Sequence, residues 1–176
     1  VVLVRHPHGG PFEIPALTVN NKNITARRIM GTNPTDAVGI HHSVAEKLSG
    51  ADFDGDTVLV IPNPTGAVKT RDALEGLKNF NPKEAYGLPD TDTTTPRMTK
   101  KNTQTEMGKI SNLITDMSIH KANDDELARA VRHSMVVIDA EKHGLNYKQS
   151  EKNNNIAELK VKYQGGARKG AATLIS

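Results

Sequence analysis

Three aspartates at alternate positions, directly ahead of an apolar run, place the strongest constraint on how this chain can fold. They lie in the segment GADFDGD at residues 50–56, and the apolar run TVLVI follows at residues 57–61. Two like charges about 4 Å apart repel by ~4 kcal/mol at an effective dielectric constant of ~20, so a bare cluster would only destabilise the fold. The spacing therefore predicts that Asp52, Asp54 and Asp56 hold a cation. Oxygen ligands, with no Cys in the chain and no His in the motif, favour Mg²⁺, or Mn²⁺ as the alternative, over Zn²⁺.

Two other interpretations of the aspartates compete with this one. A calcium loop of the EF-hand type needs Gly at its sixth position and Glu at its twelfth. Counted from Asp52, this chain has Thr57 and Asn63 there, and a strand is predicted where an EF-hand has a helix. The remaining alternative is an exposed acidic turn without function, because Asp and Gly are ordinary turn residues.

The motif resembles the catalytic aspartate motif of RNA polymerases built on a double-psi β-barrel. This family includes the largest subunit of multisubunit RNA polymerases, the cellular RNA-dependent RNA polymerases and related single-chain phage enzymes. Two upstream segments are similar in the same order. Residues 2–7, VLVRHP, resemble the family's L-x-R-x-P segment, and residues 39–48 resemble the strand and short helix that lead into the motif. Residues 139–144, DAEKHG, resemble a D-x-x-K-x-G stretch of the cellular RNA-dependent enzymes more weakly.

The resemblance implies an α+β fold, in which a complete or incomplete double-psi β-barrel precedes a mainly helical segment. It also implies template-dependent, Mg²⁺-dependent nucleotidyl transfer from nucleoside triphosphates (NTPs) to an RNA 3′ end. Asp52, Asp54 and Asp56 would hold the metal, and Arg5 would contact the nucleotide. Gly50 matches the RNA-dependent enzymes and Phe53 the DNA-dependent ones, so the template type stays open. The alternative function is a non-catalytic module, derived from a polymerase, that binds metal and nucleic acid.

The chain is expected to be inactive by itself. In the family, cations for the triphosphate come from a second double-psi barrel on the same or another chain, and no segment here repeats the barrel pattern. The sequence begins at Val1 inside an apolar run, so we expect a piece of a longer polymerase or a processed product.

Charge and composition add weaker indications. The formal net charge is +3 and the isoelectric point about 9.1, which favours a polyanionic partner such as the template or the RNA product. Either phosphate contact or a solvated face explains the basic residues near the C-terminus. The absence of Cys and of a membrane-spanning apolar run predicts a cytoplasmic protein without a membrane partner, in the host cytoplasm if phage-encoded. The candidate nucleic-acid contacts are Lys142, Lys160, Lys162, Arg168 and Lys169.

Periodicity divides the chain into residues 1–66, the barrel portion, and residues 67–176, the helical segment. In the first part we expect strands at 1–5, 24–30, 37–41 and 57–61, an edge or irregular strand at 12–19 and a short helix at 43–46. In the second part we expect a helix at 70–80, a Pro- and Thr-rich connector at 81–102, a helix capped at Thr103, a helix at 124–142 and a shorter one from 156 to Gly165. The expected buried residues are Met107, Ile110, Leu113, Ile114 and Met117 in one of these helices, and Leu127, Val131, Met135 and Ile138 in the next.

Overall fold

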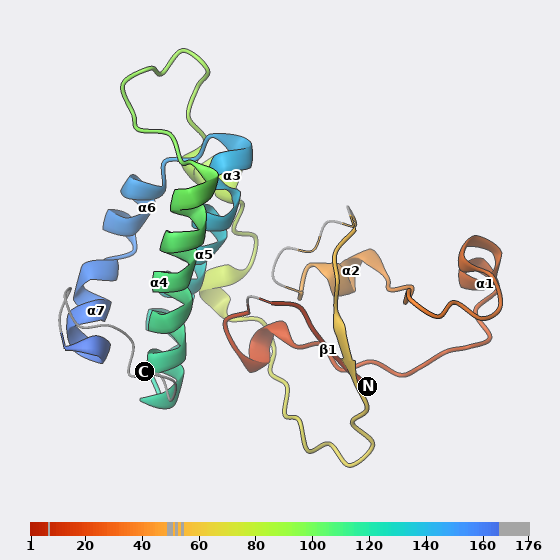
Figure 1. The fold of residues 1–176 in the computed structure, drawn as a ribbon. Coiled ribbons are helices and arrows are strands. Elements are labelled where there is room, and N and C mark those ends of the chain that lie inside the picture. Colours follow the sequence, from red (N-terminus) through yellow and green to blue (C-terminus); the bar gives the residue numbers. More distant parts are fainter. Residues whose placement is uncertain (7, 49–50, 52, 54, 166–176) are drawn as a thin grey trace. The chain divides into compact units, whose positions relative to one another are not determined.

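The computed structural model describes residues 1–6, 8–48, 51, 53 and 55–165 (Figure 1). By its internal contacts the chain divides into two compact units, Val1–Asp72 and Ala73–Ser176. We call them unit 1 and unit 2 and describe each by itself. The division falls a few residues after the boundary at 66 that the sequence predicts.

Unit 1 contains a small antiparallel sheet. Strand β1 (Val2–Val4) pairs with β2 (Leu59–Ile61) in the register Val2↔Ile61, Leu3↔Val60 and Val4↔Leu59. On its other side, β1 is bonded to the segment around Ala16, since Leu3 N donates to Pro15 O and Leu17 N donates to Val1 O. All three β1 side chains are buried, as expected for a continuous apolar run. The strands predicted at 1–5 and 57–61 are therefore confirmed.

The rest of unit 1 corrects two predicted strands. Residues 24–30 form helix α1 (Ile24–Met30), because the Asn23 side chain accepts a hydrogen bond from Ala26 N and caps the first turn. The apolar residues of this segment include Ile24 and Ile29, which are 83% and 77% exposed on the helix. Residues 37–41 form no strand.

Two other predicted elements of unit 1 have counterparts in the structure. The short helix is confirmed as α2 (His42–Ala45), capped by the His41 side chain. The segment 12–19 holds one 3-10 turn, η1 (Pro11–Glu13), and the single bridge at Ala16. Within the described residues β1 and β2 are the only two strands, so the double-psi barrel stays a prediction.

Unit 2 is helical, and its two longest helices lie side by side (Figure 1). Its elements are η2 (Glu75–Leu77), α3 (Pro82–Tyr86), α4 (Lys100–Ile119), α5 (Asp124–His143), α6 (Tyr147–Asn153) and α7 (Ile156–Gln164). Among the helices of the described residues, none combines the length and the apolar character that crossing a membrane requires.

The core of unit 2 largely follows the predicted stripes. Four of the five predicted α4 residues are buried, and Met107 is half-buried. On α5, Leu127 and Val131 are buried as predicted, but Ile138 is 39% exposed. Helix α5 packs against η2, α3, α4, α6 and α7, so it buries more than one stripe. The additional buried residues of α5 include Ala128, Ala130, Val136, Val137 and Ala140.

Several boundaries of unit 2 differ from the sequence-based ones. Helix α4 starts four residues early, because Thr99, not Thr103, accepts the capping hydrogen bond from Asn102 N. The helix predicted at 70–80 is reduced to the single turn η2, in line with its internal Gly76. The predicted connector contains α3, which Asn81 caps. Helix α6 was missed, because its mostly polar residues show no apolar period.

The end of α5 at Gly144 is confirmed, and it allows a test with two glycines. Gly144 has φ 63° and ψ 45°, and a Cβ there would lie 2.5 Å from Arg97 Nη1. Gly144→Ala should therefore lower the free energy of unfolding by about 1–2 kcal/mol. Gly108 lies inside α4, and a Cβ added there would have no atom within 4 Å. Gly108→Ala should therefore raise the free energy of unfolding by about 0.5–1 kcal/mol. Urea unfolding followed by helical circular dichroism measures both, and changes of the same sign would contradict this account.

Candidate metal and nucleic-acid site

The described part of the aspartate motif is tied to strand β1 by an ion pair. Asp52 and Asp54 lie outside the described residues, whereas Asp56 is described and contacts Arg5. The Arg5 guanidinium donates from Nε to Asp56 Oδ1 at 2.7 Å, and its Nη2 lies 2.5 Å from the same oxygen. The two side chains are only 19% and 14% exposed, so the pair is shielded from water.

The sheet register explains why these two residues meet. Extending the β1–β2 pairing by one step places Arg5 opposite Val58. Side chains alternate between the two faces of a strand, so Asp56, two residues before Val58, shares that face. A long side chain reaches such a diagonal neighbour across an antiparallel pair. The sequence singled out both residues, but it does not reveal that they contact each other.

Two described residues of the motif, Phe53 and Gly55, have a positive backbone φ angle. Phe53 has φ 64° and Gly55 has φ 112°, and the Phe53 side chain is 60% exposed. Glycine adopts such a φ without strain, whereas phenylalanine does so at a cost. Strained positions of this kind concentrate in binding and catalytic loops. The loop geometry therefore agrees with a functional segment.

The donor chemistry of Asp56 suits a hard divalent cation. A guanidinium that contacts one carboxylate oxygen fixes the orientation of the carboxylate, and such oxygens are the ligands that hard cations prefer. Within the described residues, which include one of the three motif aspartates, no group of three His, Asp or Glu side chains could hold a metal ion. The metal set predicted from the sequence thus depends on Asp52 and Asp54 as well.

A cavity of ≈ 540 Å³ lies on the same face of the sheet as Arg5 and Asp56. Leu3 and Val60, which are paired and share that face, contribute to its floor. Helix α1 adds Arg27 and Met30 to the lining, and the preceding loop adds asparagines 20, 21 and 23. No pattern in the sequence indicated this cavity, and residues 24–30, which form part of its lining, were predicted as a strand.

The candidate nucleic-acid contacts in α7 are engaged with acidic residues. Lys162 Nζ lies 2.5 Å from Glu126 Oε1, and Tyr163 donates to Glu126 Oε2 at 2.6 Å. Hydrogen bonds from Lys162 and Tyr163 lower the pKa of Glu126, and the bond to Glu126 raises the pKa of Lys162. These contacts hold the last turn of α7 against α5.

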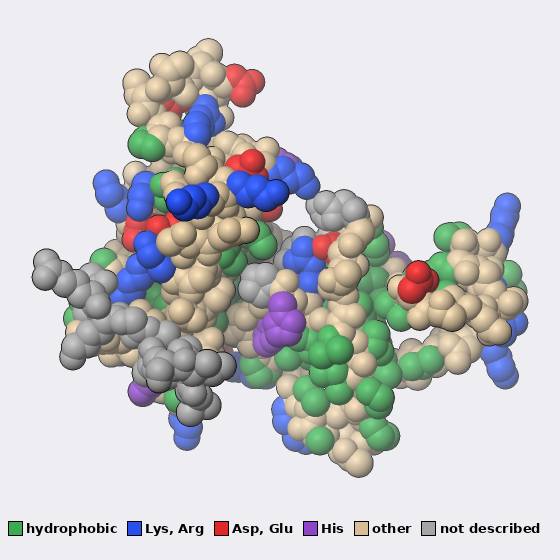
Figure 2. All heavy atoms as spheres, in the orientation of Figure 1, with side chains coloured by type: hydrophobic (Ala, Val, Ile, Leu, Met, Phe, Trp, Pro, Cys, Tyr) green, Lys and Arg blue, Asp and Glu red, His purple; other side chains and the backbone are tan. Residues whose placement is uncertain are grey.

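The other basic candidates differ in their surroundings. Lys160 lies 3.9 Å from Glu151, and Lys142 is exposed in the last turn of α5. Arg168 and Lys169 lie outside the described residues. Figure 2 shows Lys and Arg side chains interspersed with Asp and Glu over unit 2. Phosphate contact by Lys160 or Lys162 would therefore exchange one anionic partner for another.

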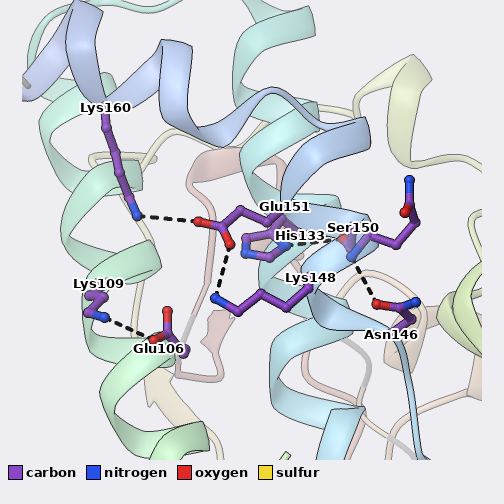
Figure 3. A network of polar contacts seen from close by, with 9 residues as sticks. Glu106, Lys109, His133, Asn146, Lys148, Ser150, Glu151 and Lys160 are labelled. Carbon is purple, nitrogen blue, oxygen red and sulfur yellow. Dashed lines mark hydrogen bonds and ion pairs between the residues drawn. The ribbon is translucent and has the colours of Figure 1, made fainter. Parts of the chain in front are cut away.

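A buried polar network in unit 2 was not foreseen from the sequence (Figure 3). His133 Nδ1 lies 3.1 Å from Ser150 Oγ, and Asn154 Nδ2 donates to the same hydroxyl at 3.3 Å. Ser150 is fully buried and His133 is 5% exposed. The pair joins α5 to α6. Because the Ser150 hydroxyl is buried away from any substrate, the pair is no candidate for nucleophilic catalysis.

This network predicts a loss of stability in acid. Burial is the main cause that lowers the pKa of His133 from 6.5 to about 4. The unfolded chain binds a proton at His133 near pH 6.5, but the folded chain does so only near pH 4, so acidification between these values favours unfolding. The free energy of unfolding should fall by up to about 3 kcal/mol across this window. Urea unfolding at several pH values measures this fall, and His133→Asn should flatten the profile. Identical profiles for the two proteins would refute this.

Comparison with known proteins supplies the family. A family model described as RNA dependent RNA polymerase matches residues 39–171. The match spans more than half of the chain, including the aspartate motif and nearly all of unit 2, and it begins after Arg5. Comparisons with curated proteins and with solved structures gave no match. The chain belongs to the RNA-dependent RNA polymerase family.

Proposed function

We propose that this chain supplies the metal-binding aspartates of a polymerase that copies an RNA template into RNA. The observation that carries the proposal is the family match at residues 39–171, which contains all three aspartates. The Arg5–Asp56 pair supports it, because it ties one of the aspartates to the sheet. Gly50 and Phe53 left the type of template open, and the description of the matching family favours RNA.

In this proposal Asp52, Asp54 and Asp56 hold Mg²⁺, or Mn²⁺ in its place. The bound metal would supply activation of the RNA 3′ hydroxyl and stabilise charge at the nucleotide's α-phosphate. The carboxylates contribute by ligating through oxygen and by fixing the position of the cation. Lys142, Lys160, Lys162, Arg168 and Lys169 contribute phosphate contacts, which position nucleic acid without reading its sequence.

A second double-psi barrel, on the same or another chain, completes the site in this proposal. Phosphoryl transfer depends on positioning and on charge stabilisation, which require cations at the triphosphate as well as the metal. The aspartate motif supplies negative charge, so the balancing cations have to come from elsewhere. The partner barrel is proposed as their source.

The test is a primer-extension assay with the complete polymerase. RNA and DNA templates of the same sequence are compared, with Mg²⁺, with Mn²⁺ and with a chelator. We expect extension on the RNA template that depends on the metal and stops in the chelator. A metal-dependent rise in melting temperature without any extension would instead indicate the non-catalytic module. Extension on the DNA template alone would overturn the proposed template.

A further inference from the structure

We propose that Arg5 is a positioning residue that holds Asp56 in the orientation needed for metal binding. This inference rests on the proposed function, since it concerns the same metal site. The family resemblance implies that Arg5 contacts the nucleotide, whereas its contact in the structure points to an action through the Asp56 carboxylate.

The geometry of the ion pair suits such a role. Two nitrogens of the guanidinium, Nε and Nη2, meet the same oxygen, Asp56 Oδ1, at 2.7 and 2.5 Å. The contact from Nε is a charge-assisted hydrogen bond, which is short and directional, and the ion-pair contact from Nη2 adds a second point of attachment to the same oxygen. Because both side chains are mostly buried, the contact persists instead of exchanging with water.

The pair also anchors one end of the motif loop. Arg5 directly follows β1, whose three side chains are buried, so its backbone is held by the sheet. At the other end of the loop, Leu48 is fully buried and accepts a hydrogen bond from Ala51 N. Between these anchors Phe53 and Gly55 adopt positive φ values. A strained residue such as Phe53 keeps its positive φ only where the surrounding structure holds it.

Two effects of Arg5 on a nearby cation oppose each other. Its positive charge repels a metal ion, but its hydrogen bond orients a ligand and the same charge offsets repulsion among the carboxylates. Lysine keeps the positive charge and loses the two-pronged contact, so Arg5→Lys separates orientation from charge. Residues that orient metal ligands typically change metal affinity by about 10–100-fold when they are replaced.

A double-mutant cycle on the full chain tests this proposal, with Mn²⁺ as the probe and electron paramagnetic resonance as the readout of binding. Arg5→Lys should weaken Mn²⁺ binding about tenfold. In an Asp56→Asn background the same substitution should change it by less than about twofold, because the residue through which Arg5 acts has lost its charge. The control is Arg28→Lys on α1, which is exposed and should leave Mn²⁺ affinity unchanged.

Binding of a fluorescent NTP at saturating Mn²⁺ distinguishes the two roles of Arg5. A positioning role predicts the same NTP affinity for the Arg5→Lys chain and the unmodified chain. Lower NTP affinity with unchanged Mn²⁺ binding, or equal weakening of Mn²⁺ binding in both backgrounds, would overturn the proposal.

A second variant covers the case in which Arg5→Lys does not fold. Asp56→Glu keeps the charge but moves the carboxylate by one methylene, so it should also weaken Mn²⁺ binding, and unchanged affinity would overturn the proposal. If the unmodified chain binds no Mn²⁺, the proposed function fails along with the inference. If that chain binds Mn²⁺ without coupling between residues 5 and 56, the inference alone fails.

Discussion

Replacing Asp54 by alanine should abolish nucleotide incorporation by the complete polymerase while the chain stays folded. Asp54 is the middle carboxylate of the motif. In the proposed site it would be shared by the metal that the three aspartates hold and a second metal that arrives with the triphosphate. Loss of a central ligand should lower incorporation by ~10³-fold or more. Without divalent metal, the melting temperature should stay the same or rise, since removal of one carboxylate relieves the repulsion within the cluster.

The measurements are single-nucleotide extension of a labelled primer and thermal melting with and without Mg²⁺. The matched control is Asp36→Ala, which removes an exposed carboxylate of unit 1 outside the motif and should leave extension unchanged. Full activity of the Asp54→Ala enzyme would show that the motif does not hold the catalytic metal. Loss of folding with no effect of metal on the unmodified enzyme would mark Asp54 as a structural residue.

The second large effect is expected from the isolated 176-residue chain, which should not extend a primer. The proposed site takes its metal ligands from this chain, whereas the cations at the triphosphate are proposed to come from a second barrel. Three carboxylates alone should bind Mg²⁺ weakly, with water completing the octahedral shell. Adding the remainder of the polymerase should restore extension.

The assay uses the purified chain, an RNA template, a primer, Mg²⁺ and all four NTPs, with and without the remaining polymerase. Its control is the remaining polymerase alone, which should be inactive because it lacks the three aspartates. Template-dependent extension by the isolated chain would contradict the proposed division of the active site. Extension by the remainder alone would show that the aspartates of this chain are dispensable.

Local sequence determined the features that depend on neighbours along the chain. The apolar runs at 1–5 and 57–61 predicted β1 and β2, and helical spacing predicted most of α4 and α5. Gly144 predicted the end of α5, since a left-handed residue there favours glycine. The motif at 50–56 and its flanking segments also indicated the double-psi β-barrel RNA polymerases, and the match at residues 39–171 confirms the relationship to RNA-dependent RNA polymerases.

Tertiary structure decided which side chains meet across long stretches of sequence. The pairing of Arg5 with Asp56 follows from the sheet register, and that of Lys162 with Glu126 from the packing of α7 on α5. Neither pair leaves a local pattern, because the partners are 51 and 36 residues apart. Helix α1 is a different case, since its capping residue outweighed the apolar residues that suggested a strand. The spacing of apolar residues along the sequence indicates which face of a helix or strand is apolar. The partner of a charged side chain depends instead on how elements distant in the sequence pack together.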